Sequence, residues 1–256
     1  GFGEIEDYKV SLQPAPLDFG DAPDGVTKLP QYPNSTYPTT LARNGARNLY
    51  DPNFCLGQNV DFDEQNGAPY AYTNQTATGD GQNLGGTVNG PAPAGYVDDD
   101  GVKQLDGTVL ATLTNGYNNT ITVTVHNPVE FGRSAYLSAW IDFNGDGDWA
   151  DAGEQLIRNN INSATGSPIA TLQANGALLG GDQEITFTFY VPYSAVSKTT
   201  FVRFRLTDAP LAAGDPGYSG AGTGIQPPRG EVEDYQVTIV HGLTAPTLNT
   251  TQPFQL

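Results

Sequence analysis

Hydrophobic and polar residues alternate with a period of two along the second half of the chain. In residues 119–127, NTITVTVHN, one face carries Ile121, Val123 and Val125, and the other carries Thr122, Thr124 and His126. Residues 184–191, EITFTFYV, repeat the pattern, with Ile185, Phe187, Phe189 and Val191 on the apolar face. This alternation is typical of half-buried β-strands.

Three further segments have the same period. Residues 135–142, 201–206 and 234–240 place these side chains on their apolar faces: Leu137, Ala139 and Ile141; Val202, Phe204 and Leu206; Tyr235, Val237 and Ile239. The opposite faces carry Tyr136, Ser138 and Trp140 in the first segment and Arg203 and Arg205 in the second, which we expect to be exposed. Five strands with one polar face each predict an all-β fold, an antiparallel β-sandwich of jelly-roll or immunoglobulin-like type with long loops.

The remaining segments lack such a pattern. Residues 17–101 are rich in Gly, Pro, Asn, Asp and Tyr, so we expect short strands, bound ions or aromatic packing to hold them together. Residues 209–230 indicate one long loop before the last strand. We therefore divide the chain into an N-terminal strand with a Pro-containing linker (1–16), a β-sandwich (17–242) and a C-terminal tail or linker (243–256).

Composition supports the β fold and narrows the partners. The 31 Gly and 19 Pro, with 10% aromatic and only 15% charged residues, favour many turns that join short strands. The formal net charge is -17, which argues against nucleic acid or an anionic membrane surface as partner, because both require basic patches. Cations are the natural partners, and hard carboxylate oxygens suit Ca²⁺.

Three features fit a secreted protein that has lost its signal peptide. The chain has one cysteine, Cys55, and no methionine, and no apolar run is long enough for membrane insertion. Cys55 has no partner for an internal disulfide and no zinc-site spacing around it, so we expect it to be buried rather than reactive.

The strongest local motif is the acidic segment DFNGDGDWADAGE, residues 142–154. Oxygen donors alternate along it, and Gly147 permits a sharp turn around one ion, as in an EF-hand loop without its helices. The closing acid lies one position later than in that loop. The predicted calcium ligands are Asp142, Asn144, Asp146, Asp148, Asp151 and Glu154. The other interpretation is a turn between strands, which Asn, Asp and Gly favour for backbone reasons.

Further acidic groups predict at least one more Ca²⁺ site. Asp98, Asp99 and Asp100 are adjacent, and such carboxylates are costly to hold together without a cation. The last strand begins with Glu231, Glu233 and Asp234, which could serve as ligands or protect a strand edge. Two upstream groups, each by itself typical of a solvated turn, are Asp18, Asp21 and Asp24, and Asp61, Asp63 and Glu64.

An enzymatic function has little support. His126 and His241 lie on a polar strand face and after the last strand, and no nucleophile elbow, zinc-protease or phosphate-loop motif is present. Carboxylate pairs suitable for a glycosidase are abundant, but nothing singles out one pair.

A series of motifs resembles a known family. LDFGDAPD, DDDGV, AWIDFNGDGDWADAGE, FVRFRLTD and RGEVEDYQV, in this order over residues 17–240, resemble the GEVED domain of bacterial secreted and cell-surface proteins. The resemblance implies an extracellular β-sandwich module without known catalysis, in proteins associated with adhesion or surface structure. Two positions depart from the family pattern: GDG stands for GDD at residues 79–81, and DDDG stands for DEDG.

The first ten residues, GFGEIEDYKV, nearly repeat residues 230–239, GEVEDYQVTI. Three explanations remain open: residues 1–12 are the last strand of a preceding module in a tandem array, a strand donated to a neighbouring subunit, or a second strand of the same domain. The linker QPAP, residues 13–16, favours the first two.

These observations predict a non-enzymatic, extracellular structural or adhesive module that is stabilised by Ca²⁺. Its expected partners are identical subunits or neighbouring modules, joined head to tail by strand donation into a surface fibre or a tandem-repeat adhesin. The alternative is a Ca²⁺-dependent module that binds surface glycans by stacking Tyr70, Tyr72 and Tyr96 on sugar rings.

Overall fold

The computed structural model describes residues 15–24, 37–65, 68–79, 97–222 and 226–242. The predicted all-β fold is confirmed, because these residues form fourteen strands and two short 3₁₀ helices, Leu41–Arg43 and Val129–Phe131, and no α-helix among them. None of the described segments is a helix long and apolar enough to cross a membrane. The duplicated segment 1–12 and the tail 243–256 lie outside the described residues.

Two sheets form the body of the molecule. The larger has six strands in the order β11-β10-β9-β13-β14-β7, and the smaller has the order β12-β8-β3, with β6 also paired to β8. The strands of the larger sheet are β7 (Thr112–Asn115), β9 (Tyr136–Ile141), β10 (Gln155–Arg158), β11 (Ile161–Asn162), β13 (Thr199–Thr207) and β14 (Gly230–His241). Those of the smaller are β3 (Cys55–Leu56), β6 (Val102–Gln104), β8 (Asn118–His126) and β12 (Gln183–Tyr190). All pairs are antiparallel except β14 with β7.

The apolar faces of the two sheets pack against each other. Every inward side chain predicted for the strands near residues 120, 138, 187, 204 and 237 lies in one buried cluster, including Val123, Phe187, Leu137, Phe204 and Val237. β8 and β12 also keep the predicted alternation, since their other side chains are exposed or half-buried. The predicted sandwich core is thus confirmed.

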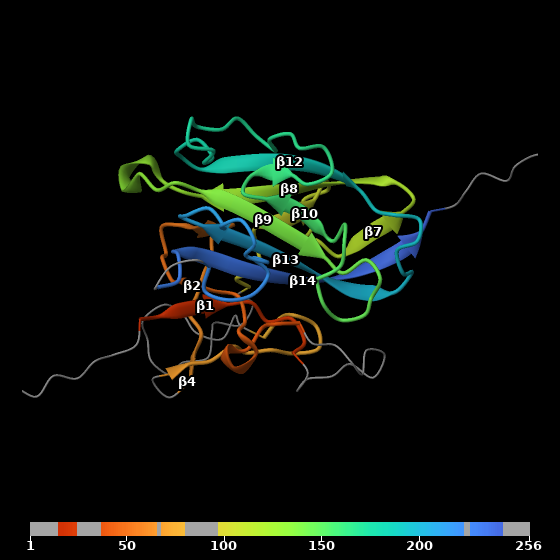
Figure 1. The fold of residues 1–256 in the computed structure, drawn as a ribbon, viewed down its shortest axis with the longest axis horizontal. Helices are drawn as coiled ribbons and strands as arrows, with labels where there is room; N and C mark the ends of the chain where they lie inside the picture. The colour runs from red at the N-terminus through yellow and green to blue at the C-terminus, as the bar shows by residue number, and fades with distance from the viewer. Residues whose placement is uncertain (1–14, 25–36, 66–67, 80–96, 223–225, 243–256) are drawn as a thin grey trace, which may run out of the picture.

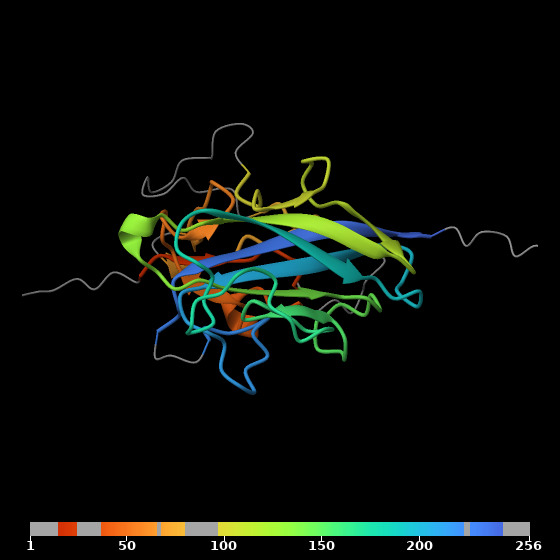
Figure 2. The ribbon, with the colours of Figure 1, turned by 90° about the horizontal axis from the view of Figure 1, so that it is seen from above.

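The larger sheet is covered on its outer face as well, which the sequence pattern did not predict. The described residues of the N-terminal segment, with the short strands β1 and β2, lie against it, so that β9, β13 and β14 form a middle layer between them and the smaller sheet (Figure 1). In the view from above, the long strands of both sheets run roughly along the long axis of the molecule (Figure 2). A second buried cluster fills this outer interface: Ala22, Tyr37, Ala77, Trp140, Trp149, Phe201 and Leu211.

This covering corrects the prediction of polar outer faces for β9 and β13. All six residues of β9 are buried, including Ser138 and Trp140, and neither Arg203 nor Arg205 is exposed at all. The physical reason is that the N-terminal segment supplies enough polar and aromatic partners to compensate for the buried guanidinium groups.

Short strands and aromatic packing hold the N-terminal segment together, as expected. β1 (Leu17–Phe19) pairs with β2 (Arg47–Leu49), and β4 (Glu64–Gln65) pairs with β5 (Ala68–Pro69). The buried Tyr37 ring lies 4.5 Å from that of Trp149 and 5.3 Å from that of Phe201, centroid to centroid. Cys55 in β3 is buried, as expected. Burial raises the pKa of its thiol, which disfavours the reactive thiolate.

Candidate metal-binding sites

The predicted calcium loop lies between β9 and β10. Asp142, directly after β9, is fully buried and accepts hydrogen bonds from the Tyr37 hydroxyl (2.6 Å) and from the backbone amides of Gly145 and Gly147. Gly147 has a φ of 99°, so the turn uses a conformation that other residues rarely adopt. The chain therefore folds back around the Asp142 carboxylate.

Glu154 closes this loop from the other side. Its carboxylate accepts the amides of Phe143 (3.0 Å) and Asp151 (3.2 Å) and is almost completely buried. Burial, followed by the nearby charge of Asp142, raises its pKa to about 7. A pocket of ≈ 410 Å³, lined by Asn144, Asp151, Glu154 and Ser194 among others, opens beside the loop. Glu154 thus borders this pocket, and the second buried carboxylate, Asp142, lies close enough to raise its pKa.

The other four predicted ligands lie at the exposed or half-buried rim of the loop. The Asn144 amide group donates to Asp146 (3.2 Å) and to Asp151. Asp146 and Asp148 accept backbone amides two residues further along, as in Asx turns. The structure therefore brings Asp142 and Glu154 together and leaves Asn144, Asp146, Asp148 and Asp151 as more exposed oxygen donors outside them.

The acids that open β14 have three different environments. Glu231 accepts the amide of Leu56 in β3 (2.5 Å), and Glu233 accepts the amides of Asp100 (3.0 Å) and Gly101 (2.9 Å), so both side chains point toward the smaller sheet. Both are buried, and burial raises the pKa of Glu233 to about 8 and that of Glu231 well above its usual value.

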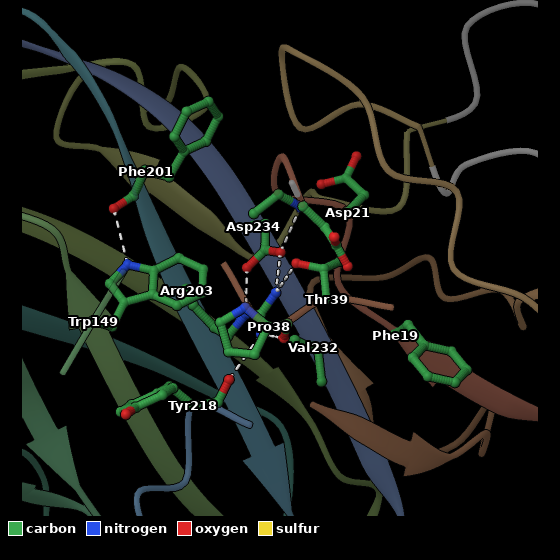
Figure 3. A network of polar contacts seen from close by, with 12 residues as sticks. Phe19, Asp21, Pro38, Thr39, Trp149, Phe201, Arg203, Tyr218, Val232 and Asp234 are labelled. Atoms are coloured by element: carbon green, nitrogen blue, oxygen red, sulfur yellow. Dashed lines mark hydrogen bonds and ion pairs between the residues drawn. The ribbon is translucent and has the colours of Figure 1, made fainter. Parts of the chain in front are cut away.

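Asp234 points to the opposite face of β14 and forms an ion pair. The Arg203 guanidinium holds it through two bonds, Nε to Oδ1 at 2.7 Å and Nη2 to Oδ2 at 2.6 Å (Figure 3). Arg203 also donates to the carbonyls of Pro38 and Tyr218 and lies 4.5 Å from the centre of the Trp149 ring. Asp234 therefore has a cationic partner within the protein.

The three adjacent aspartates, Asp98, Asp99 and Asp100, lie beside β14 and the residues that follow β3. Asp99 accepts the amide of Asp234 (3.1 Å), and Asp100 accepts the amide of Gln58 (2.8 Å) and the side chain of Asn59 (2.7 Å). Burial raises the pKa of Asp98 to about 6, and also raises the pKa of Asp99 and Asp100. The segment therefore connects the start of β14 to the smaller sheet.

The upstream aspartates differ most from their predicted environment. Taken singly, they were typical of solvated turns, but Asp18, Asp21, Asp24, Asp61 and Asp63 are all buried. Asp18 accepts the amide of Val232 (2.6 Å), and Asp63 accepts the amide of Phe19 (2.7 Å). For Asp61 and Asp63, the only signal in the sequence was the lack of basic residues between positions 48 and 102.

The geometry of these groups is not that of a preformed chelate. Within the described ranges, no three Asp, Glu, His or Cys side chains already surround a common point as a bound metal ion requires. Most of these carboxylates instead accept backbone amides. Such amides orient a carboxylate and leave it able to bind a cation after a small rotation.

Taken together, the fold and the acids define an all-β sandwich whose final strand begins with a buried acidic motif, spelled GEVED at residues 230–234. Residues 136–238, from β9 to within β14, match the family model of the GEVED domain. This match confirms, over these residues, the resemblance seen in the sequence. A search of curated proteins finds no match.

Proposed function

We propose that this chain is a non-enzymatic, extracellular structural or adhesive module, stabilised by Ca²⁺. It assembles head to tail with identical subunits or neighbouring modules by strand donation, as part of a surface fibre or a tandem-repeat adhesin. The match of residues 136–238 to the GEVED family model supports the extracellular part of this proposal, which the family resemblance implies. The observation that carries it is the open outer edge of β12.

β12 pairs with β8 along its whole length, from Gln183 opposite Val125 to Tyr190 opposite Asn118. The amides of Gly181 and Val191, on either side of β12, donate to β8-side carbonyls. Because antiparallel pairing alternates, the odd-numbered residues bond to β8, and the amides of Glu184, Thr186 and Thr188 point away from it. No backbone hydrogen bond to this outer side occurs among the described residues.

The corresponding edge of β14 is already closed. Its last residues pair with β7, and the amides of Val232 and Asp234 donate to the carboxylates of Asp18 and Asp99. An additional strand would have to displace these carboxylates, so a donated strand is directed to β12 instead.

The sequence of the duplicated segment suits this edge. Tyr8, Val10 and Leu12 alternate with Lys9 and Ser11, so an extended form of residues 8–12 has one apolar face. At the β12 edge that face continues the inward row of Ile185, Phe187 and Phe189. Contacts of this kind are not self-closing and generate fibres.

Assembly is tested by electron microscopy of the full chain at increasing concentration, beside a variant that lacks residues 1–12. We expect fibres from the full chain and isolated particles from the truncated one. Fibres that persist after truncation would refute strand donation and favour the tandem-array origin of the segment. Full chains that stay single at every concentration would refute assembly itself.

The calcium part rests on the buried pair Asp142 and Glu154, of which Glu154 lines a pocket beside the loop. Saturating a site one hundredfold above its Kd stabilises the folded state by about 2.7 kcal/mol, which raises the melting temperature of a domain of this size by about 5–10 °C. We expect Glu154→Gln to lose much of this gain, whereas Glu184→Gln, on exposed β12, keeps it. An identical melting transition with Ca²⁺ and with EDTA would disprove calcium stabilisation.

A Ca²⁺-dependent glycan-binding module is the second candidate. Tyr70 is 46% exposed, and its ring lies 5.0 Å from that of Tyr72 in an edge-to-face pair that could stack on a sugar. Tyr96, the third predicted tyrosine, lies outside the described residues. Binding on a glycan array that requires Ca²⁺ and is lost in Tyr70→Ala would favour this function, and an array without hits would remove it.

A further inference from the structure

Four buried aspartates from three distant segments meet beside the edge of β14. They are Asp18 in β1, Asp61 and Asp63 after β3, and Asp98, and at most 7% of any of them is exposed. Asp18 interacts electrostatically with Asp61 and Asp98, and Asp63 interacts with all three of the others. We refer to this set as the interior aspartate cluster.

Backbone amides hold the cluster in place. Oδ2 of Asp18 accepts the amide of Val232 in β14 at 2.6 Å, and Oδ2 of Asp63 accepts the amide of Phe19 in β1 at 2.7 Å. The chain around Asp63 is itself fixed, because its amide donates to the carbonyl of Leu17 at 2.7 Å. The carboxylates are therefore oriented by the fold and not by chance rotamers.

No ion pair joins Asp18, Asp63 or Asp98 to a basic side chain in the described part of the chain. Two buried guanidinium groups form their hydrogen bonds outside the cluster: Arg203 with Asp234, and Arg205 with Asn48 and the carbonyls of Gly217 and Gly220. Arg205 interacts electrostatically with Asp18, but no ion pair joins the two side chains.

One oxygen of the cluster has no partner. Oδ1 of Asp63 is buried and makes no hydrogen bond, although this side chain is only 1% exposed. A buried carboxylate oxygen without a donor costs free energy, and Asp63 also interacts electrostatically with the carboxylates of Asp18, Asp61 and Asp98.

We infer that the interior aspartate cluster binds one Ca²⁺, separate from the loop at residues 142–154, with Asp18, Asp61, Asp63 and Asp98 as its ligands. An all-oxygen set with several carboxylates suits Ca²⁺, which accepts 6–8 oxygens in flexible geometry, better than Mg²⁺. Because no three of these side chains yet surround one point, binding requires the carboxylates to rotate toward the ion.

This site would fasten the N-terminal segment to the GEVED domain. Asp18, Asp61 and Asp63 belong to the covering layer, and the amide that holds Asp18 belongs to β14. The inference deepens the calcium part of the proposed function and is independent of strand donation. It therefore survives if no fibres form, and it fails alone if only the loop binds the ion.

The test is calorimetric titration of the metal-free full chain with CaCl₂, followed by thermal melting with and without the ion. The variants are Asp63→Asn in the cluster, Glu154→Gln in the loop, and Asp106→Asn, an exposed aspartate, as the matched control. We expect Asp63→Asn to remove one bound ion per chain and Glu154→Gln to weaken a different one. Asp106→Asn leaves the number of bound ions unchanged.

Melting separates a binding role from a merely structural one. Without Ca²⁺, Asp63→Asn relieves repulsion and melts at a higher temperature than the unmodified chain; with Ca²⁺ the order reverses. If Asp63→Asn does not fold, Asp61→Asn replaces it in the same experiments. Equal ion counts and equal Ca²⁺-induced melting shifts in the cluster variant and the unmodified chain would overturn the inference.

Discussion

At the scale of single residues, the ion pair between Arg203 and Asp234 joins β13, β14 and the covering segment. Both side chains are fully buried, and the guanidinium makes two bonds to the carboxylate. Lysine cannot form this two-pronged contact, so Arg203→Lys should lower the free energy of unfolding by about 3–5 kcal/mol. Urea unfolding measures the change. Arg229→Lys, in a partly exposed pair with Asp51, should cost under about 1 kcal/mol; equal losses would contradict the argument.

The same ion pair sets the identity of Gly20. A Cβ atom at this position would lie 2.8 Å from Nη2 of Arg203 and even closer to Oδ2 of Asp234. Gly20→Ala should therefore destabilise the fold by about 1–3 kcal/mol, because neither partner can retreat. Gly180→Ala is the matched control, since nothing lies within 4 Å of its added Cβ. Both variants are compared by urea unfolding, and a neutral Gly20→Ala would show that the pair can shift.

At the scale of elements, the proposed assembly can be tested by removing a single backbone N–H donor from the outer edge of β12. Thr186 directs its amide away from β8, so Thr186→Pro removes an outward donor and leaves the β8 ladder intact. We expect this variant to fold and to lose fibres. Thr186→Val keeps the amide and should keep the fibres. Circular dichroism checks the fold and electron microscopy the assembly; fibres from a folded Thr186→Pro protein would exclude this edge.

How far the sequence predicts an element depends on what covers it. β8 and β12 each have one solvent-exposed face, so the period of two in residues 119–127 and 184–191 was sufficient to predict these strands. β9 and β13 have two buried faces, and the second cover comes from residues 15–79, whose sequence has no period. Arg203 consequently looked like a surface residue, although it donates to the carbonyl of Pro38, 165 positions away in the covering segment.

The candidate sites follow the same rule. Asp142 and Glu154 are twelve positions apart in one loop, so spacing was enough to pair them. Asp18 and Asp63 meet only because β1 lies beside residues 61–63 and against β14, which is topology that a linear pattern does not contain. Local chemistry was therefore predictable, and the meeting of distant carboxylates was not.

At the scale of the whole molecule, a net charge of -17 is not confined to the surface. Ten of the buried polar residues are Asp, and three are Glu. Acids that are buried without cations raise the free energy of the folded state at neutral pH, because they must either carry a proton or repel one another. Stability of the metal-free protein should therefore depend on pH in an unusual direction.

The pKa of Asp98 is raised to about 6 and that of Glu233 to about 8, in both cases first by burial. Both exceed the values of about 4 in an unfolded chain, so the folded state binds more protons. Their contribution to stability is complete below about pH 4 and is lost as the pH rises through 6 and 8. The metal-free protein should therefore melt at a lower temperature at pH 8 than at pH 5. Glu233→Gln, which still accepts the Gly101 amide, should flatten this dependence, and Ca²⁺ should stabilise most at pH 8. A melting temperature that rises from pH 5 to 8 without metal would mean that these carboxyl groups are ionised at no cost to the fold.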